Sequence, residues 1–398
     1  MSSAPAGRPR RSAPSTDADP AEVARSTHPV ARLPEQWRLV LEQWGERAYR
    51  GAQIFRWIHA RGVLDPREMT DLAKPLRERL ANAEWPTIGH VERVARAADG
   101  TRKVVLILSD EARVECVLIP NPGAADSPPE GEDPGVTEGK TDAPSNRVTL
   151  CVSTQYGCKM GCAFCASGQA GFRRHLQPEE IVGQVLAARR QLAPDEQLQN
   201  LVVMGMGEPL DAYEQTARAL RLIMHPSGLG MSPRRITVST VGVVAGIERL
   251  GRDFEGKVGL AVSLHAASDE VRNQIVPLNR RVPLARLLTA LREYPLPPRR
   301  RITIEYTLIA GVNDDLAEAK RLTALLRGVP VKLNLIPMNP VPGSPLRAPD
   351  GSRVAQFRQV LIDAGYSCFL RTPRGDEVSA ACGQLAFSTE AAAPAQGG

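Results

Sequence analysis

Three closely spaced cysteines are the part of the sequence best suited to metal chemistry. Cys158, Cys162 and Cys165 fall on one loop, which also contains Gly161. Thiolates at such short spacings bind either zinc or an iron–sulfur cluster. A structural zinc site closes with four ligands, and neither a second CxxC pair nor a pair of histidines lies nearby in the sequence to complete one. The spacing therefore favours an iron–sulfur cluster with one iron left open for a ligand, and zinc is the alternative.

The composition is that of a globular protein whose cysteines are expected to remain as thiols. The chain has 398 residues, of which 42% are apolar and seven are cysteines. Residues 1–26 contain no apolar run, so we expect neither a signal peptide nor a transmembrane helix there, and we expect a cytoplasmic protein that does not associate with membranes. Cytoplasmic thiols are kept reduced. Metal binding or thiol chemistry is therefore favoured over a static disulfide framework.

The charge balance is mildly basic. Fifty Lys and Arg against 44 Asp and Glu give a formal net charge of +6, which favours an anionic partner. The arginines form short runs that could hold a phosphate backbone, at 173–174, 234–235, 280–281 and 299–301. Solvated helix ends explain each run equally well, so charge alone does not assign a partner.

The first part of the chain is predicted to be helical and then to form a β-hairpin. Apolar spacing predicts three short helices, over 35–44, 52–60 and 74–80. Two apolar runs, 103–108 and 114–119, flank a turn and predict the hairpin. The segment that follows is rich in Pro, Gly, Asp, Glu and Ser and has little to bury, which predicts a disordered insertion.

From residue 147 onward, apolar runs alternate with helical stretches, the pattern of repeated βα units. The predicted strands are 148–152, 200–204, 235–239, 258–263, 302–308, 331–336 and 367–371. The predicted helices are 178–190, 212–224, 243–251, 284–293, 315–327 and 352–364. The fold class is therefore α/β, a partial (β/α)6 barrel with a small helical N-terminal accessory domain and a β-hairpin. Such a barrel carries its chemistry at the carboxyl ends of its strands.

The expected boundaries follow from these patterns. They are a disordered tail 1–30, a helical accessory domain 31–95, a β-hairpin 96–120, a disordered insertion 121–147, the barrel 148–386 and a disordered tail 387–398.

Motifs at the predicted strand ends resemble those of the radical S-adenosylmethionine (SAM) superfamily. Its hallmark is a CxxxCxxC loop with an aromatic residue before the last cysteine, here Phe164. Gly205-Met206-Gly207-Glu208-Pro209 follows the second barrel strand, as the motif that contacts the SAM amino group does in that superfamily. Two longer stretches, Cys151–Cys158 and Arg374–Leu385, resemble the RlmN/Cfr family of RNA methyltransferases. The resemblance covers about residues 33–386.

This resemblance implies a [4Fe-4S] cluster and SAM as cofactors, with two SAM molecules consumed per turnover. The implied cluster ligands are Cys158, Cys162 and Cys165. The residues implied for the SAM pocket are Gly207, Glu208, Ser239, Ser263, Leu264, His265 and Asn339.

The resemblance also implies a reaction and its catalytic residues. Electron-poor adenine carbons do not attack the methyl group of SAM, so the family uses a radical route. By motif match, Cys382 carries the methyl group as S-methylcysteine, Cys151 is the resolving thiol that forms a transient disulfide with Cys382, and Glu115 accepts the ring proton. Without the motif match, a lone Glu on a strand is usually a surface residue and a lone Cys usually a small buried hydrophobe.

The implied product is an adenine methylated at C2, in 23S rRNA and tRNA. The implied partners are RNA and a flavodoxin- or ferredoxin-type electron donor, and the protein is expected to be a monomer. Two alternatives stay open: methylation at C8 with the same cysteines, as in Cfr, and a non-catalytic RNA-binding protein with a structural zinc.

Overall fold

The computed structural model describes residues 20–83, 85, 87–121, 146–371 and 374–385, in two compact units. The first unit contains residues 1–86 and 227–229, and the second contains 87–226 and 230–398. The expected insertion 121–147 and tail 387–398 lie almost wholly outside the described residues. In the described part of the chain, no helix is long and apolar enough to cross a membrane.

Four helices form the first unit. They are α1 (Pro20–Ser26), α2 (Pro34–Gln43), α3 (Arg50–His59) and α4 (Lys74–Asn82). The three predicted helices match α2 to α4 within two residues at each end. Apolar side chains on one side of α2 and α3, including Trp37, Leu41, Ile54 and Phe55, are fully buried and form the core. The expected disordered tail 1–30 is wrong in part. Helix α1 lies inside this range, and a 3-10 turn at Pro29–Ala31 begins inside it.

A ten-stranded sheet forms the centre of the second unit. Strands β1 (Gly89–Arg96), β2 (Arg102–Leu108), β3 (Arg113–Pro120) and β4 (Arg147–Cys151) pair antiparallel in that order. Beyond β4 the strands are parallel, in the order β7 (Gln197–Val203), β8 (Ile236–Thr240), β9 (Gly259–Ser263), β10 (Ile302–Leu308), β11 (Val331–Pro337) and β12 (Cys368–Leu370). The seven strands predicted from residue 147 onward all exist.

Strand β1 corrects the predicted hairpin and the predicted helical range 31–95. Its residues are half-buried or exposed, with Arg93 and Arg96 facing solvent, so the segment has no apolar run that would mark a strand. Pairing of its backbone along β2 holds it in the sheet. The result is three antiparallel strands before β4 instead of two.

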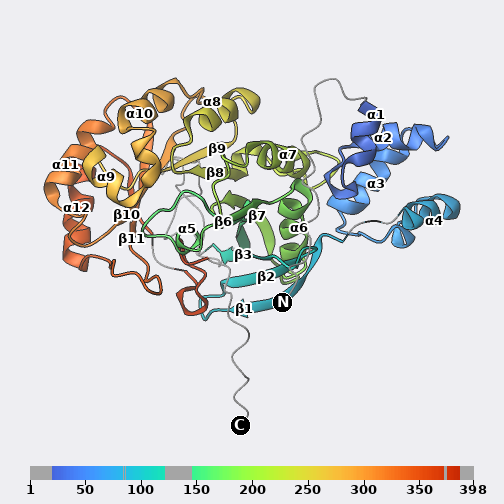
Figure 1. Cartoon of the computed structure of the whole chain (residues 1–398), viewed down its shortest axis with the longest axis horizontal. Coiled ribbons are helices and arrows are strands. Elements are labelled where there is room, and N and C mark those ends of the chain that lie inside the picture. Colours follow the sequence, from blue (N-terminus) through green and yellow to red (C-terminus); the bar gives the residue numbers. More distant parts are fainter. Residues whose placement is uncertain (1–19, 84, 86, 122–145, 372–373, 386–398) are drawn as a thin grey trace, which may run out of the picture. The chain divides into compact units, whose positions relative to one another are not determined.

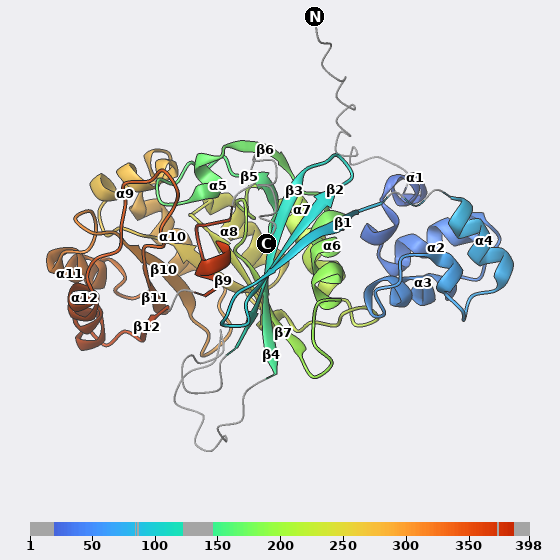
Figure 2. The same cartoon turned by 90° about the horizontal axis from the view of Figure 1, so that it is seen from below.

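The helices of the second unit lie along the outside of the sheet (Figures 1 and 2). They are α6 (Pro178–Arg189), α7 (Tyr213–Met224), α8 (Val244–Asp253), α10 (Leu284–Glu293), α11 (Leu316–Leu325) and α12 (Gly351–Asp363). Two short helices were not predicted, α5 (Ala166–Gln169) and α9 (Asp269–Ile275). A separate two-stranded hairpin of β5 (Gln155–Gly157) and β6 (Phe172–His175) flanks the cysteine loop. This arrangement is the partial (β/α) barrel expected from the sequence.

Candidate active site

The three-cysteine loop runs from the end of β5 to the start of α5. Gly161 adopts a φ of +66°, a left-handed conformation that glycine takes without strain, and this turns the loop between the first two cysteines. Cys158 and Cys162 are buried and Cys165 is partly buried. All three pack against one apolar cluster that includes Ile275 and Met338. The fold therefore gathers three thiols on one sheltered loop.

Burial controls the ionisation of these thiols. It raises the pKa of Cys158 to about 12 and raises the pKa of Cys162 well above its usual value, and the neighbouring cysteines raise both further. Burial also raises the pKa of Cys165. Metal binding would have to displace a proton from each thiol, because thiolates are the ligands.

The loop fits an iron–sulfur cluster by its donor set. Within the described residues no three His, Cys, Asp or Glu side chains are arranged as a ready metal site. Protonated thiols have no reason to converge on a point, so their side chains would turn toward the metal on binding. Three soft sulfur donors on one loop, each close enough to affect its neighbours' charge, match a cluster with three protein ligands.

Glu208 follows β7 and joins two of the strand-end loops. Its Oε1 accepts the backbone N–H of Leu210 at 3.0 Å, and its Oε2 accepts that of Val241, after β8, at 2.9 Å. Burial raises the pKa of Glu208 to about 7 despite these hydrogen bonds. Its carboxylate is thus used by the protein's own backbone and shapes the loops that were predicted to bind SAM.

Gly207 is required by a close approach of two chain segments. It has a φ of +104°, and a Cβ at this position would lie 2.5 Å from the Cβ of Gln155. Gln155 holds the same turn, because its Oε1 accepts the backbone N–H of Glu208 at 2.9 Å. Its Nε2 donates to Asp211 Oδ2 at 2.9 Å. The β4–β5 segment and the loop after β7 are therefore packed as one piece.

The ends of β8 and β9 supply the next predicted residues. Ser239 and Ser263 are partly exposed, whereas Leu264 and His265 are buried. Burial lowers the pKa of His265 to about 3, so the ring is neutral, and its Nδ1 accepts the backbone N–H of Thr307 at 2.9 Å. The ring also meets the ring of Phe164 edge-on, with centroids 4.4 Å apart. The structure thereby joins the end of β9 to the cysteine loop.

Arg272 is a fully buried residue that joins the same loops. Its guanidinium donates to the carbonyl oxygens of Leu264 at 2.9 Å and Val241 at 2.6 Å, and to Asn279 Oδ1 at 2.8 Å. Burial lowers its pKa to about 10. Sequence reasoning did not single it out, and nothing in an isolated Arg on a helix marks it as buried.

The antiparallel part of the sheet brings Glu115 and Cys151 to one face. In the register, Lys103 faces Val117, and Val117 faces Cys151. Directly opposed residues share a face, and Glu115 lies two residues from Val117, so Lys103, Glu115 and Cys151 all point to the same side. Lys103 Nζ lies 3.0 Å from Glu115 Oε1, and both side chains are buried. Lys103 was not predicted as a site residue.

The opposite face of β3 has a structural role. Cys116, the neighbour of Glu115, is fully buried and points toward the backbone carbonyl of Gln184 in α6. Burial raises the pKa of Cys116 to about 12. Alternation along the strand thus separates an inert thiol from the face that holds Glu115 and Cys151.

The segment after β12 carries Cys382 to the loop after β11 and to α5. Cys382 is exposed. Its backbone carbonyl oxygen accepts a hydrogen bond from Asn339 Nδ2 at 2.9 Å. Next along the chain, the carbonyl oxygen of Gly383 accepts the backbone N–H of Ala166 at 2.8 Å, at the start of α5. Cys382 is therefore held between the loop after β11 and the helix that follows the cysteine loop.

The other side of this segment contacts the β1–β2 turn and β2. Asp99 Oδ2 accepts the backbone N–H of Gly375 at 3.0 Å. Lys103 Nζ donates to the carbonyl oxygen of Ser379 at 3.3 Å. We refer to residues 374–385 as the C-terminal loop. It touches the helix after the cysteine loop, the loop after β11 and the antiparallel face.

Comparison with known proteins gives the family. Residues 152–322 match the Radical SAM superfamily, and residues 34–84 match the Ribosomal RNA large subunit methyltransferase N-terminal domain. A relative from Sorangium cellulosum (strain So ce56), named Dual-specificity RNA methyltransferase RlmN, is 57% identical over 91% of this chain and 96% of its own length. The chain belongs to the RlmN family of radical SAM RNA methyltransferases.

Further similarities agree with this assignment. A relative of the same name from Marinobacter nauticus is 44% identical over 88% of this chain and 89% of its own length. The crystal structure of a radical SAM methyltransferase from Sphaerobacter thermophilus superposes with a TM-score of 0.79, at 40% identity, over 89% of this chain and 98% of that one. Membership of the superfamily implies a [4Fe-4S] cluster and SAM as cofactors. The comparisons favour neither the C8 alternative nor a non-catalytic zinc protein.

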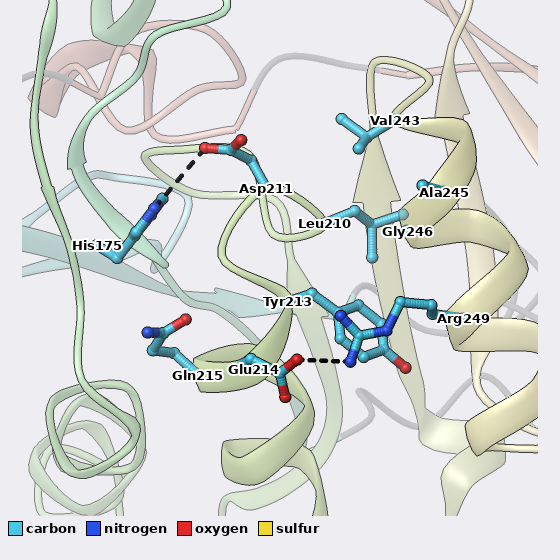
Figure 3. Close-up of a pocket in the computed structure, with 10 residues that line it drawn as sticks. All are labelled: His175, Leu210, Asp211, Tyr213, Glu214, Gln215, Val243, Ala245, Gly246 and Arg249. Carbon is cyan, nitrogen blue, oxygen red and sulfur yellow. Dashed lines mark hydrogen bonds and ion pairs between the residues drawn. The ribbon is translucent and has the colours of Figure 1, made fainter. Parts of the chain in front are cut away.

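A cavity of about 350 Å³ lies between the loop after β7, α7 and the start of α8 (Figure 3). It is lined by His175, Leu210, Asp211, Tyr213, Glu214, Gln215, Val243, Ala245, Gly246 and Arg249. None of the residues predicted to bind a cofactor or to act in catalysis lines it. Asp211, at its edge, forms an ion pair of 2.6 Å with Lys159 of the cysteine loop. The cavity thus adjoins the predicted active site without being part of it.

Proposed function

We propose that this chain methylates C2 of an adenine in 23S rRNA and in tRNA, through a methyl group carried on Cys382. One observation supports this most directly. An exposed cysteine lies on a loop that is bonded at one side to the start of α5, which directly follows Cys165, and at the other to Lys103, the partner of Glu115. A methyl carrier must meet both a hydrogen-abstracting cofactor and the substrate base, and such a location meets both needs.

The cofactor half of the proposal concerns the cysteine loop and the strand ends. Cys158, Cys162 and Cys165 would hold the cluster, and the residues after β7, β8, β9 and β11 would hold SAM. The bound cluster and SAM would supply a 5′-deoxyadenosyl radical and the one-electron chemistry that this requires, with two SAM molecules used per turnover. Glu208 and Arg272 set the shape of this pocket through their backbone contacts.

Cys382 has two successive tasks in this proposal. Its sulfur accepts a methyl group from the first SAM, and S-adenosylhomocysteine leaves. The methyl group of the resulting thioether would then give up a hydrogen atom to the radical derived from the second SAM, and its carbon would bond to the adenine ring carbon. The adduct would pass its one excess electron back to the bound cluster. Protein and RNA are at that point joined through Cys382.

Cys151 and Glu115 release the product. The thiolate of Cys151 attacks the sulfur of Cys382, so that an S–S bond forms and the C–S bond to the base breaks. The supplied reductant then reduces this disulfide and restores both thiols. Glu115 takes the proton from the ring carbon, while the former methylene carbon takes up a proton to become methyl. The shared face of Glu115 and Cys151 supports this division of labour.

The remaining parts of the proposal follow from the family. We propose a monomer that works in the cytoplasm and receives electrons from a flavodoxin- or ferredoxin-type protein. Cleavage of SAM by a reduced cluster requires a one-electron donor of low potential, and such proteins carry a suitable centre.

The test is anaerobic turnover of reconstituted protein with SAM, a reductant, and either 23S rRNA or tRNA. The RNA is then digested, and methyladenosines are separated by mass spectrometry against standards. We expect 2-methyladenosine with both RNAs. Formation of 8-methyladenosine would contradict the regiochemistry, and an intact cluster without any methylated base would contradict the proposed reaction.

A further inference from the structure

No motif indicated Lys103, and it contacts two parts of the proposed machinery at once. Its ammonium lies 3.0 Å from Glu115 Oε1 and 3.3 Å from the carbonyl oxygen of Ser379. Ser379 lies on the C-terminal loop, three residues before Cys382. Lys103 is only 7% exposed and Glu115 only 6%, so their ion pair is sheltered from water, and the contact with Ser379 is partly buried.

Burial of this kind needs a reason. An ammonium group taken out of water loses its hydration, and an ion pair with a single carboxylate often fails to compensate for that loss. A salt bridge on the surface would stabilise the fold at least as well. The free-energy cost of burying the Lys103–Glu115 ion pair is therefore better explained by the groups that the pair holds in position than by any gain in stability.

The geometry limits what Lys103 can hold. Lys103 and Glu115 are diagonal neighbours on β2 and β3, and the side chain of Glu115 points to the face that Cys151 shares. A glutamate side chain has three rotatable bonds and therefore several rotamers in principle available to it. A fixed ammonium at Oε1 selects one of them, and the bond to Ser379 anchors the ammonium in turn.

We propose that Lys103 is a positioning residue that aims the carboxylate of Glu115 at the ring carbon of the adenine joined to Cys382. This inference rests on the proposed function and adds a residue to it. Lys103 itself does not touch the substrate. Because its second contact is to the C-terminal loop, the orientation of Glu115 is tied to the position of the chain that carries Cys382.

Replacement of Lys103 should stop the reaction at a particular stage. In Lys103→Met we expect the methyl occupancy of Cys382 and the iron content to stay at the wild-type level, since neither needs Glu115. The yield of 2-methyladenosine should fall at least about tenfold, because a general base contributes about 100-fold or more and depends on its aim. The covalent protein–RNA adduct should accumulate, as it should in Glu115→Gln.

Two further measurements separate positioning from mere support of the fold. In Lys103→Ala, added methylamine or ethylamine should restore part of the product yield, whereas the matching neutral alcohols should not. In the double variant Lys103→Met with Glu115→Gln, the yield should equal that of Glu115→Gln alone, because Lys103 acts through Glu115. The control is Lys257→Met, which breaks an exposed Lys–Glu pair of 2.5 Å with Glu255 elsewhere in the same unit and should behave as wild type.

The outcomes are distinct. Wild-type yield in Lys103→Met, a further loss in the double variant, or a parallel loss of Cys382 methylation and iron would each overturn the inference and leave the proposed function standing. A wild-type protein with an intact cluster that makes no methylated adenine would overturn the proposed function and the inference together.

Discussion

The parallel and antiparallel parts of the sheet present their functional residues in different ways. In the parallel part, the residues sit at the ends of the strands, as Ser239 and Ser263 do, or on the loops just beyond them, as Gly207, Glu208, His265 and Asn339 do. In the antiparallel part, Lys103 and Glu115 lie within strands β2 and β3. Parallel strands all end at one edge, so their loops meet there, whereas neighbouring antiparallel strands end at opposite edges and can gather side chains only across a face.

This difference divides the proposed chemistry. Loops can wrap a cofactor and adjust to it, while side chains on a face are held in register by the backbone ladder. The cofactor half therefore depends on loop conformation, and the half that acts on the base depends on strand register. The C-terminal loop is the part that must fit both.

The largest expected effect comes from removing a cluster ligand. Cys158→Ala should lose the iron–sulfur cluster, so that iron content drops and no methyladenosine forms, because an incomplete donor set cannot hold the cluster. The checks are iron analysis and mass spectrometry of the RNA. Cys368→Ala removes a buried thiol on β12, outside the site, and should keep both iron and activity. Full activity in Cys158→Ala would contradict the proposal that the cysteine loop binds the cluster.

Loss of Cys151 should affect only the antiparallel face. In Cys151→Ala we expect an intact cluster and methylated Cys382, but no release of the base, so a covalent protein–RNA adduct should accumulate. Denaturing gel electrophoresis with labelled RNA would show it. Cys116→Ala, on the other face of β3, serves as the matched control and should release product normally. Full turnover without any adduct in Cys151→Ala would exclude its resolving role.

The C-terminal loop can be displaced by a substitution that changes neither a cofactor-binding residue nor a residue that acts on the base. Gly375 has a φ of +66°, and a Cβ there would lie 2.7 Å from Thr101 Cγ2. Gly375→Ala should therefore move the loop and lower the rate about tenfold, equivalent to about 1.4 kcal/mol, with the cluster intact. Gly343→Ala has a similar φ of +76° and nothing within 4 Å, and should lower the rate much less. Equal rates in the two variants would show that the contact with Thr101 is unimportant.

The last prediction concerns Glu208 and pH, and it changes the stability of the fold without changing the reaction. Burial raises the pKa of Glu208 from 4.5 to about 7, so between these values the folded protein binds a proton that the unfolded chain releases. The contribution of Glu208 to stability therefore falls as pH rises through this range, by about 1 to 3 kcal/mol. Thermal unfolding should show that the melting temperature of the wild type, relative to that of Glu208→Gln, is higher at pH 5 than at pH 8. A constant difference between the two proteins would contradict this.

Much of the fold was predictable because its signals are local. Each strand from β4 to β12 in the main sheet is a short apolar run, and each lies within three residues of its predicted bounds. Strand β1 was missed because a half-exposed edge strand has no apolar run, and only pairing with β2 keeps it in place. The short helix α9 was missed as well, although it carries Arg272, the residue that joins the loops after β8 and β9.

For the site, the sequence by itself determined which thiols and strand-end residues resemble those of a known chemistry, because such motifs lie within a few consecutive residues. Only the tertiary structure decided how they meet. Glu115 and Cys151 are 36 positions apart and share a face through the register of β3 and β4. Lys103 and Ser379 are separated by 276 positions. No spacing along the chain can indicate such a contact, because it exists only once the last segment of the chain folds back onto the β1–β3 strands.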